Sequence, residues 1–75
     1  MKKELEKNNW DFILYQYGEK KVISVVFHNS FVDVSKSFIL ENNEENYDFQ
    51  QLKELAEKIR NNYESFTNRE LIPSI

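Results

Sequence analysis

Residues 48–66, DFQQLKELAEKIRNNYESF, carry the strongest structural signal in this chain of 75 residues. Apolar side chains recur at helical spacing along one face of the segment: Phe49, Leu52, Leu55, Ala56, Ile59, Tyr63 and Phe66. The other face is polar: Lys53, Glu54, Glu57, Lys58, Arg60, Asn61 and Glu64. The pattern predicts one long amphipathic helix, and Asp48 with Gln51 fits a capping box at its start. Such a helix has to bury its apolar face against the segment that precedes it.

The preceding residues 10–40 predict an antiparallel sheet. Three runs are rich in aromatic and β-branched side chains, at residues 10–17, 21–27 and 31–40. The turns between them are short, and the first contains Gly18, the single glycine of the chain. Connections this short favour hairpins. The expected fold class is therefore α+β: a three-stranded antiparallel β-meander followed by one long C-terminal amphipathic helix packed on the sheet.

The remaining segments are expected to complete a single domain over residues 1–75. Residues 1–9 are highly charged and predict an N-terminal tail or one short helical turn. Residues 67–75 predict a C-terminal tail, with an added edge strand from residues 69–75 as an open alternative. Asn42 and Glu45 also fit a capping box, so either the helix begins earlier than Asp48 or a separate short turn precedes it.

Composition limits the classes of function. The formal net charge is −3, the wrong sign to attract nucleic acid, and the chain has no cysteine for a disulfide or a thiolate metal site. Charged residues follow Met1 where a signal peptide would need an apolar segment, and no run is long enough to span a membrane. We therefore expect a cytoplasmic protein with no direct nucleic-acid or membrane partner and no cofactor.

One helix can cover only one face of a sheet, yet alternation places apolar side chains on both faces. The helix-facing rows are expected to be Ile23, Val25 and Phe27 in the second strand, and Val32, Val34, Phe38 and Leu40 in the third. The opposite face is mixed and leaves aromatic surface uncovered. Two interpretations stay open: the C-terminal tail covers this surface, or the surface is an interface for a second copy or another protein.

Other clusters have simpler interpretations. His28, Ser30 and Asp33 could suggest a nucleophile with its base, but a hairpin turn offers no pocket, so a turn is favoured. The acidic residues 41–48 lack the glycine and the distal glutamate of a calcium loop, so a solvated helix start or a negative patch is favoured over a metal site. Lysines near the strand tyrosines fit protection of a sheet edge.

A resemblance to a known family rests on the Trp-led first strand, the Val-rich second strand and several residues of the second half: Glu44, Glu45, Leu52, Leu55, Ala56, Ile59, Arg69, Leu71 and Ile72. The pattern resembles small bacterial immunity proteins, which neutralise a cognate secreted or contact-delivered toxin. The resemblance implies a stoichiometric inhibitor rather than an enzyme, with no catalytic residues. Many such toxins are nucleases with basic substrate grooves.

The candidate partner-binding residues follow from the aromatic excess and the acidic segment: Tyr15, Tyr17, Asp33, Glu41, Glu44, Glu45 and Asp48. The carboxylates would speed association with a basic partner, and buried tyrosines would supply affinity. The expected partner is a cognate toxin protein. The alternatives are a phage- or plasmid-encoded inhibitor of a host defence enzyme and a structural homodimer.

Overall fold

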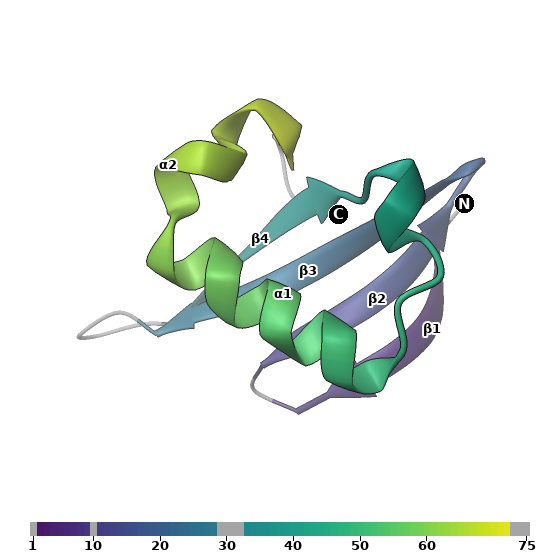
Figure 1. Cartoon of the computed structure of the whole chain (residues 1–75), viewed down its shortest axis with the longest axis horizontal. Helices are drawn as coiled ribbons and strands as arrows, with labels where there is room; N and C mark the ends of the chain where they lie inside the picture. The colour runs from purple at the N-terminus through teal and green to yellow at the C-terminus, as the bar shows by residue number, and fades with distance from the viewer. Residues whose placement is uncertain (1, 10, 29–32, 73–75) are drawn as a thin grey trace.

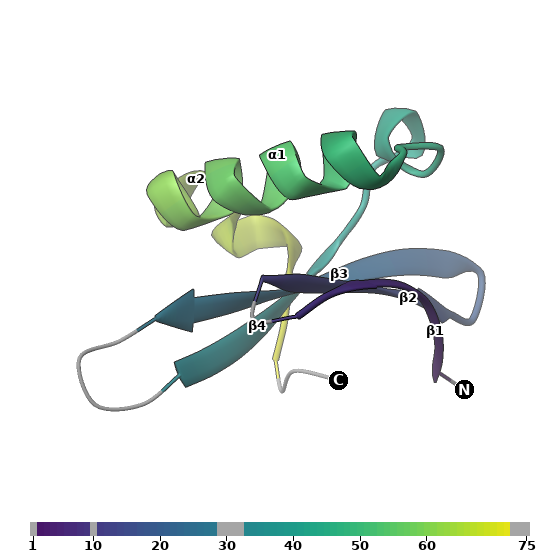
Figure 2. The ribbon, with the colours of Figure 1, turned by 90° about the horizontal axis from the view of Figure 1, so that it is seen from below.

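The protein is a five-stranded antiparallel sheet with helical segments on one of its faces (Figures 1 and 2). The computed structural model describes residues 2–9, 11–28 and 33–72. The strands are β1 (Lys2–Asn8), β2 (Phe12–Tyr17), β3 (Lys20–His28), β4 (Asp33–Ile39) and β5 (Glu70–Leu71). Their order in the sheet is the order in the chain, and every neighbouring pair is antiparallel. The helical segments are η1 (Asn42–Glu44), α1 (Phe49–Asn61), α2 (Tyr63–Phe66) and η2 (Thr67–Arg69).

The expected three-stranded meander is wrong, because strands are added at both of its edges. β1 pairs with β2 along Lys2–Asn8, the segment predicted to be a tail or a helical turn. Its side chains are nearly all exposed, so it carries none of the apolar periodicity that identifies a strand in sequence. β5 pairs with β4 at Ser37 and Phe38, which agrees with the alternative of an edge strand near the C-terminus. Backbone pairing with an already formed edge, rather than propensity, makes both strands.

The expected single helix over residues 48–66 is also wrong. α1 ends at Asn61, and Asn62 leaves helical geometry with φ −133° and ψ 43°. Two consecutive asparagines weaken the helix at this point. The break lets Tyr63 and Phe66 turn onto β4, where the Tyr63 ring meets Phe38 edge-on at 6.1 Å and the Phe66 ring meets Phe38 at 6.5 Å.

The start of α1 is as predicted. The Asp48 carboxylate accepts a hydrogen bond from the Gln51 backbone N–H at 2.9 Å, and the Gln51 side chain accepts one from the Asp48 N–H at 3.0 Å. A separate short turn precedes the helix, which was one of the two alternatives predicted for residues 42–45. That turn is η1, whose capping box joins Glu41 and Glu44 rather than Asn42 and Glu45.

The core lies between α1, α2 and the sheet. Its buried side chains are Phe12, Leu14, Ile23, Val25, Phe38, Leu40, Leu52, Leu55, Ala56, Ile59 and Phe66. The helix face and the helix-facing row of β3 are thus as expected, apart from Phe49, which is 41% exposed. Lys36 falls in the helix-facing row of β4, where its ammonium group lies 5.2 Å from the Tyr63 ring centroid and 3.7 Å from Glu70.

The far face of the sheet is less open than alternation suggested. Val22, Ser24 and Ser37 at its centre are all less than 9% exposed, whereas Tyr17 at its margin is 44% exposed. Leu71 of β5 extends the row that contains Ser37. Residues 73–75, part of the tail considered as a cover, lie outside the described residues.

Replacing Ser37 by alanine is expected to leave the free energy of unfolding unchanged or to raise it by up to about 1 kcal/mol. In the part of the chain that the structure describes, the Ser37 hydroxyl is the buried side-chain group without a hydrogen-bond partner. Removing it therefore removes a desolvation cost and no bond. Chemical denaturation of Ser37→Ala tests this, and a loss of more than about 1 kcal/mol would show that the hydroxyl is bonded.

Candidate functional site

An open groove lies on the helical side of the molecule, between the segment after β4 and the helices. Two adjoining pockets of about 220 Å³ and 550 Å³ form it, and they share Glu44, Tyr47 and Lys58. The smaller pocket lies against α1, and the larger one continues toward α2 and η2. Residues of η1, α1, α2 and η2 thus surround one groove.

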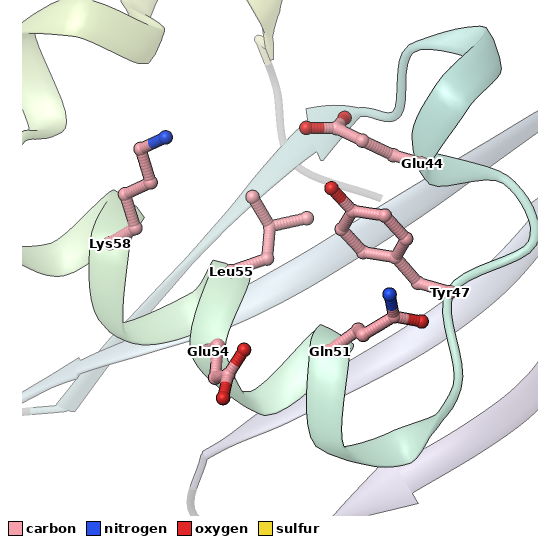
Figure 3. A pocket seen from close by; sticks show the side chains of 6 residues that line it. All are labelled: Glu44, Tyr47, Gln51, Glu54, Leu55 and Lys58. Carbon is pink, nitrogen blue, oxygen red and sulfur yellow. The ribbon is translucent and has the colours of Figure 1, made fainter.

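The smaller pocket combines an apolar centre with polar edges (Figure 3). The Leu55 side chain lies in the middle, with Lys58 on one side and Tyr47 on the other. The Tyr47 hydroxyl points toward Leu55, and the Glu44 carboxylate extends across the pocket toward the side of Lys58. Gln51 and Glu54 complete the lining from α1. Leu55 and Tyr47 also pack on the core, so the pocket rests on rigid structure.

A buried ion pair holds η1 at the edge of the groove. Arg69 of η2 lies 2.7 Å from Oε1 of Glu44, and the side chains are only 17% and 8% exposed. The same oxygen accepts a hydrogen bond from the Glu41 backbone N–H at 2.9 Å. Arg69 also lies 4.8 Å from the centroid of the Phe66 ring and 3.6 Å from Glu41, whose side chain is 62% exposed. The C-terminal part of the chain therefore sets the position of the groove wall.

A second contact fastens this wall to the sheet. The Lys21 ammonium group of β3 donates a hydrogen bond of 2.6 Å to the Glu45 backbone carbonyl. Arg69 reaches the Ile39 carbonyl of β4 at 3.5 Å. Segment 41–47 is thus tied to the last part of the sheet and to η2, and it is a fixed wall rather than a free loop.

The negative charge of the molecule is concentrated here. The groove and the segment 41–48 beside it carry five carboxylates (Glu41, Glu44, Glu45, Asp48 and Glu54) and two cations (Lys58 and Arg69). Their formal balance of −3 equals that of the whole chain, and the other eight acidic residues are matched by eight basic ones. Lys21, which is bonded to the Glu45 carbonyl, reduces this local excess to −2, so the groove side is acidic.

Comparison of the chain with protein-family models, with curated proteins and with solved structures found no match. The site is therefore interpreted from its own chemistry. In the described ranges, no group of three or more His, Cys, Asp or Glu side chains is placed to hold a metal ion. No helix in those ranges is both long and apolar enough to cross a membrane.

The structure separates the predicted acidic residues by role. Glu41 and Asp48 are exposed, and Glu45 is half-buried with its backbone bonded to Lys21. Asp48 is engaged in capping α1. Glu44 is buried in the ion pair with Arg69, so its main contact is internal. Glu41 and Asp48 are thus the exposed residues of the predicted group, and each also caps a helix start.

The predicted tyrosines lie elsewhere. Tyr15 and Tyr17 belong to β2 and face away from the helices, and the Lys2 ammonium group lies 4.7 Å from the Tyr15 ring centroid. Asp33 begins β4 opposite His28, at the far end of the β3–β4 hairpin, and the side chains of both lie outside the described part of the structure, as does Ser30. The structure therefore does not bring the tyrosines and the acidic segment together on one surface.

The sequence did not mark Tyr47, Glu54 and Lys58 as groove residues. Tyr47 is the single aromatic residue within the acidic segment 41–48, a signal that could have marked it. Glu54 and Lys58 are ordinary residues of the polar helix face, and only their position opposite Tyr47 distinguishes them. No sequence pattern carries that information.

A second polar cluster beneath α2 has a structural role. The Tyr63 hydroxyl donates a 2.5 Å hydrogen bond to Glu70, which also pairs with Lys36. This hydrogen bond, together with loss of hydration and the Glu70 charge, raises the pKa of Tyr63 above its ordinary value of 10.0, while Lys36 acts in the opposite direction. The cluster ties β5 to α2 and closes the core at that end.

The Tyr63–Glu70 bond is expected to make stability pH-dependent in alkaline solution. Because the folded protein holds the Tyr63 proton more tightly than the unfolded chain, this contribution is fully present below pH 10 and is lost as the pH rises through the folded-state pKa. The difference in unfolding free energy between the parent and Tyr63→Phe should therefore shrink over that range. Denaturant titrations from about pH 8 to about pH 12 measure it. Glu70→Gln should lose the same pH dependence of stability. If the unfolding free energies of both variants keep a constant difference from the parent over this pH range, the Tyr63–Glu70 bond is not its cause.

Proposed function

We propose that this protein is a stoichiometric inhibitor that binds a basic surface of another protein, in the manner of an immunity protein and its cognate toxin. The observation that carries the proposal is the excess of carboxylates, five against three cations, around one groove. A partner with a positive surface would approach with this side foremost, since long-range attraction steers and accelerates encounter.

The groove also has the composition of a small protein-binding surface. Leu55 and the Tyr47 ring supply an apolar centre, and exposed carboxylates such as Glu41 and Glu54 supply a polar rim. Interfaces commonly combine a desolvated aromatic centre with a charged rim, in which the centre gives affinity and the rim gives rate and specificity. This arrangement supports binding rather than catalysis.

A nuclease toxin is the partner class that fits best, because its nucleic-acid groove is basic. The proposal places the protein in the cytoplasm, where it acts as an inhibitor and not as an enzyme. A phage- or plasmid-encoded inhibitor of a host defence enzyme would use the same chemistry. Coexpression with the product of the adjacent reading frame, followed by size-exclusion chromatography and an activity assay of that product, tests the proposal. A stable complex without loss of the partner's activity would contradict inhibition.

A homodimer is the second candidate, favoured by exposed apolar side chains away from the groove. Tyr17 is 44% exposed and Ile72 is 83% exposed. Light scattering over a wide concentration range tests it, and a constant monomer mass would exclude it.

Reversing two accessible charges is expected to slow association with the partner. Glu41→Lys combined with Glu45→Lys should lower the association rate constant on the order of tenfold or more at low salt, while the dissociation rate constant changes less. Stopped-flow or surface-based kinetics measure both. The matched control is Glu4→Lys with Glu6→Lys, the same charge change on exposed positions of β1. Equal effects of the two variants would mean that net charge, and not the groove, controls association.

A further inference from the structure

We infer that the smaller pocket is a receptor for a single arginine side chain of the partner protein. The inference rests on the proposed function and names the group that its groove would recognise. The pocket lies between Tyr47 and α1 and has a volume of about 220 Å³. That is the space of about seven waters at their share of liquid volume, and it is below the range of about 300–1,000 Å³ typical of small-molecule sites. The smaller pocket therefore has room for one long side chain, and the groove continues beyond it into the larger pocket of about 550 Å³.

A carboxylate oxygen of Glu44 supplies the first recognition group. Glu44 lines the pocket and its side chain is only 8% exposed. Its contacts with Arg69 and with the Glu41 N–H both use Oε1. Among the described residues, the hydrogen bonds of this carboxylate use Oε1, and Oε2 is open to solvent at the pocket (Figure 3). A carboxylate fixed by an internal ion pair thus presents a second, preorganised acceptor to the pocket.

The other lining groups suit a planar cation. Glu54 adds a second carboxylate, and Tyr47 adds an aromatic ring. A guanidinium group can donate several hydrogen bonds in one plane and stack on an aromatic face, which a lysine ammonium group cannot do as well. Leu55 lies where the aliphatic part of an arginine side chain would pack. Tyr47 therefore suits the face of the guanidinium plane, Glu54 suits its N–H groups and Leu55 suits the aliphatic part of the side chain.

The positive charge of Lys58 repels a cation in the same pocket, so the effect of removing this charge tests the inference. Lys58 lines the pocket from the side opposite Tyr47, and the residue is exposed. A cation in the pocket experiences repulsion from Lys58, so Lys58→Gln should strengthen arginine binding. An anionic ligand would show the opposite response.

Titration of the whole chain with N-acetyl-arginine methylamide tests the inference, followed by amide chemical shifts in ¹⁵N-labelled protein. We expect saturable shifts at Tyr47, Gln51, Glu54 and Leu55. The uncharged isostere N-acetyl-citrulline methylamide should bind on the order of tenfold more weakly, because it lacks the charge-assisted bonds. Glu54→Gln should weaken arginine binding by a similar factor, and Lys58→Gln should strengthen it.

Glu57→Gln is the matched control, since Glu57 is exposed on α1 and is not among the lining residues of the groove. It removes the same charge and should leave the affinity unchanged. Shifts confined to other surfaces, equal shifts with the citrulline compound, or weaker binding in Lys58→Gln would overturn the inference. A partner complex that forms normally with Glu54→Gln would also overturn it while leaving the proposed function standing. If arginine binds in the pocket but no partner is inhibited, the arginine receptor stands and the proposed function is wrong.

Discussion

Replacing Ile59 by alanine is expected to lower the free energy of unfolding by about 2–5 kcal/mol. Ile59 is 1% exposed and belongs to the apolar face of α1 that covers the sheet. The substitution removes three carbon atoms from a closely packed site, and it costs both their transfer from water and the cavity that they leave. A domain of 75 residues has a small total stability, so this loss is a large part of it.

Urea titration followed by circular dichroism measures the effect of Ile59→Ala. Lys53→Ala is the matched control on the same helix, because Lys53 is exposed and alanine is at least as good a helix former. We expect the control to unfold within about 0.5 kcal/mol of the parent. If Ile59→Ala and Lys53→Ala unfold together, the buried face of α1 is assigned incorrectly.

Replacing Arg69 by methionine is expected to cost about 3–5 kcal/mol, the range for removing one partner of a buried ion pair. The substitution leaves Glu44 in a site where its side chain is 8% exposed and without its cation. The variant should also loosen the groove wall, because Arg69 connects η2 to Glu44 and to the Ile39 carbonyl. Amide hydrogen exchange at Glu44, Glu45 and Tyr47 should therefore become faster relative to α1.

Two further variants separate burial from charge. Glu41→Gln removes the exposed carboxylate that lies 3.6 Å from Arg69, and it should cost no more than about 1 kcal/mol. Glu44→Leu combined with Arg69→Met should recover much of the stability lost in Arg69→Met, because no buried charge remains unpaired. If Arg69→Met and Glu41→Gln have equal effects, the Arg69–Glu44 pair does not hold the wall.

The apolar periodicity of residues 48–66 was sufficient to identify the buried face of α1, and the Asp48–Gln51 capping box located its start. It did not reveal the break at Asn62. Tyr63 and Phe66 continue the helical spacing, so sequence alone favours an unbroken helix, whereas their contacts with Phe38 favour a turn onto β4. Tertiary packing outweighed local periodicity there.

The two edge strands show a different limit. β1 contains Lys2, Lys3, Glu4, Glu6 and Lys7, and its side chains have no buried face to create a pattern. β5 has two residues, too few for any periodicity. Both exist because β2 and β4 offer unpaired backbone groups, and pairing satisfies them whatever the side chains are.

The candidate site depends on contacts between distant residues. The acidic segment 41–48 was interpreted as a solvated helix start or a negative patch, and its sequence did not show that Glu44 turns inward to Arg69 while Glu41 remains exposed. That contact joins residues 25 positions apart, and it depends on the turn at Asn62 that brings η2 back over β4. Tyr47 lies at the same pocket as Glu54 and Lys58 because the segment between η1 and α1 runs beside the helix.

Sequence by itself determined an α+β domain with one amphipathic helix over apolar strands and an acidic segment between them, because these features follow from local spacing and composition. Tertiary structure alone decided the number of strands, the end of α1 and the side chains that meet in the groove. These features depend on contacts between residues that are distant in the sequence. Such contacts form only when the chain folds, and they produce no periodic pattern in the sequence.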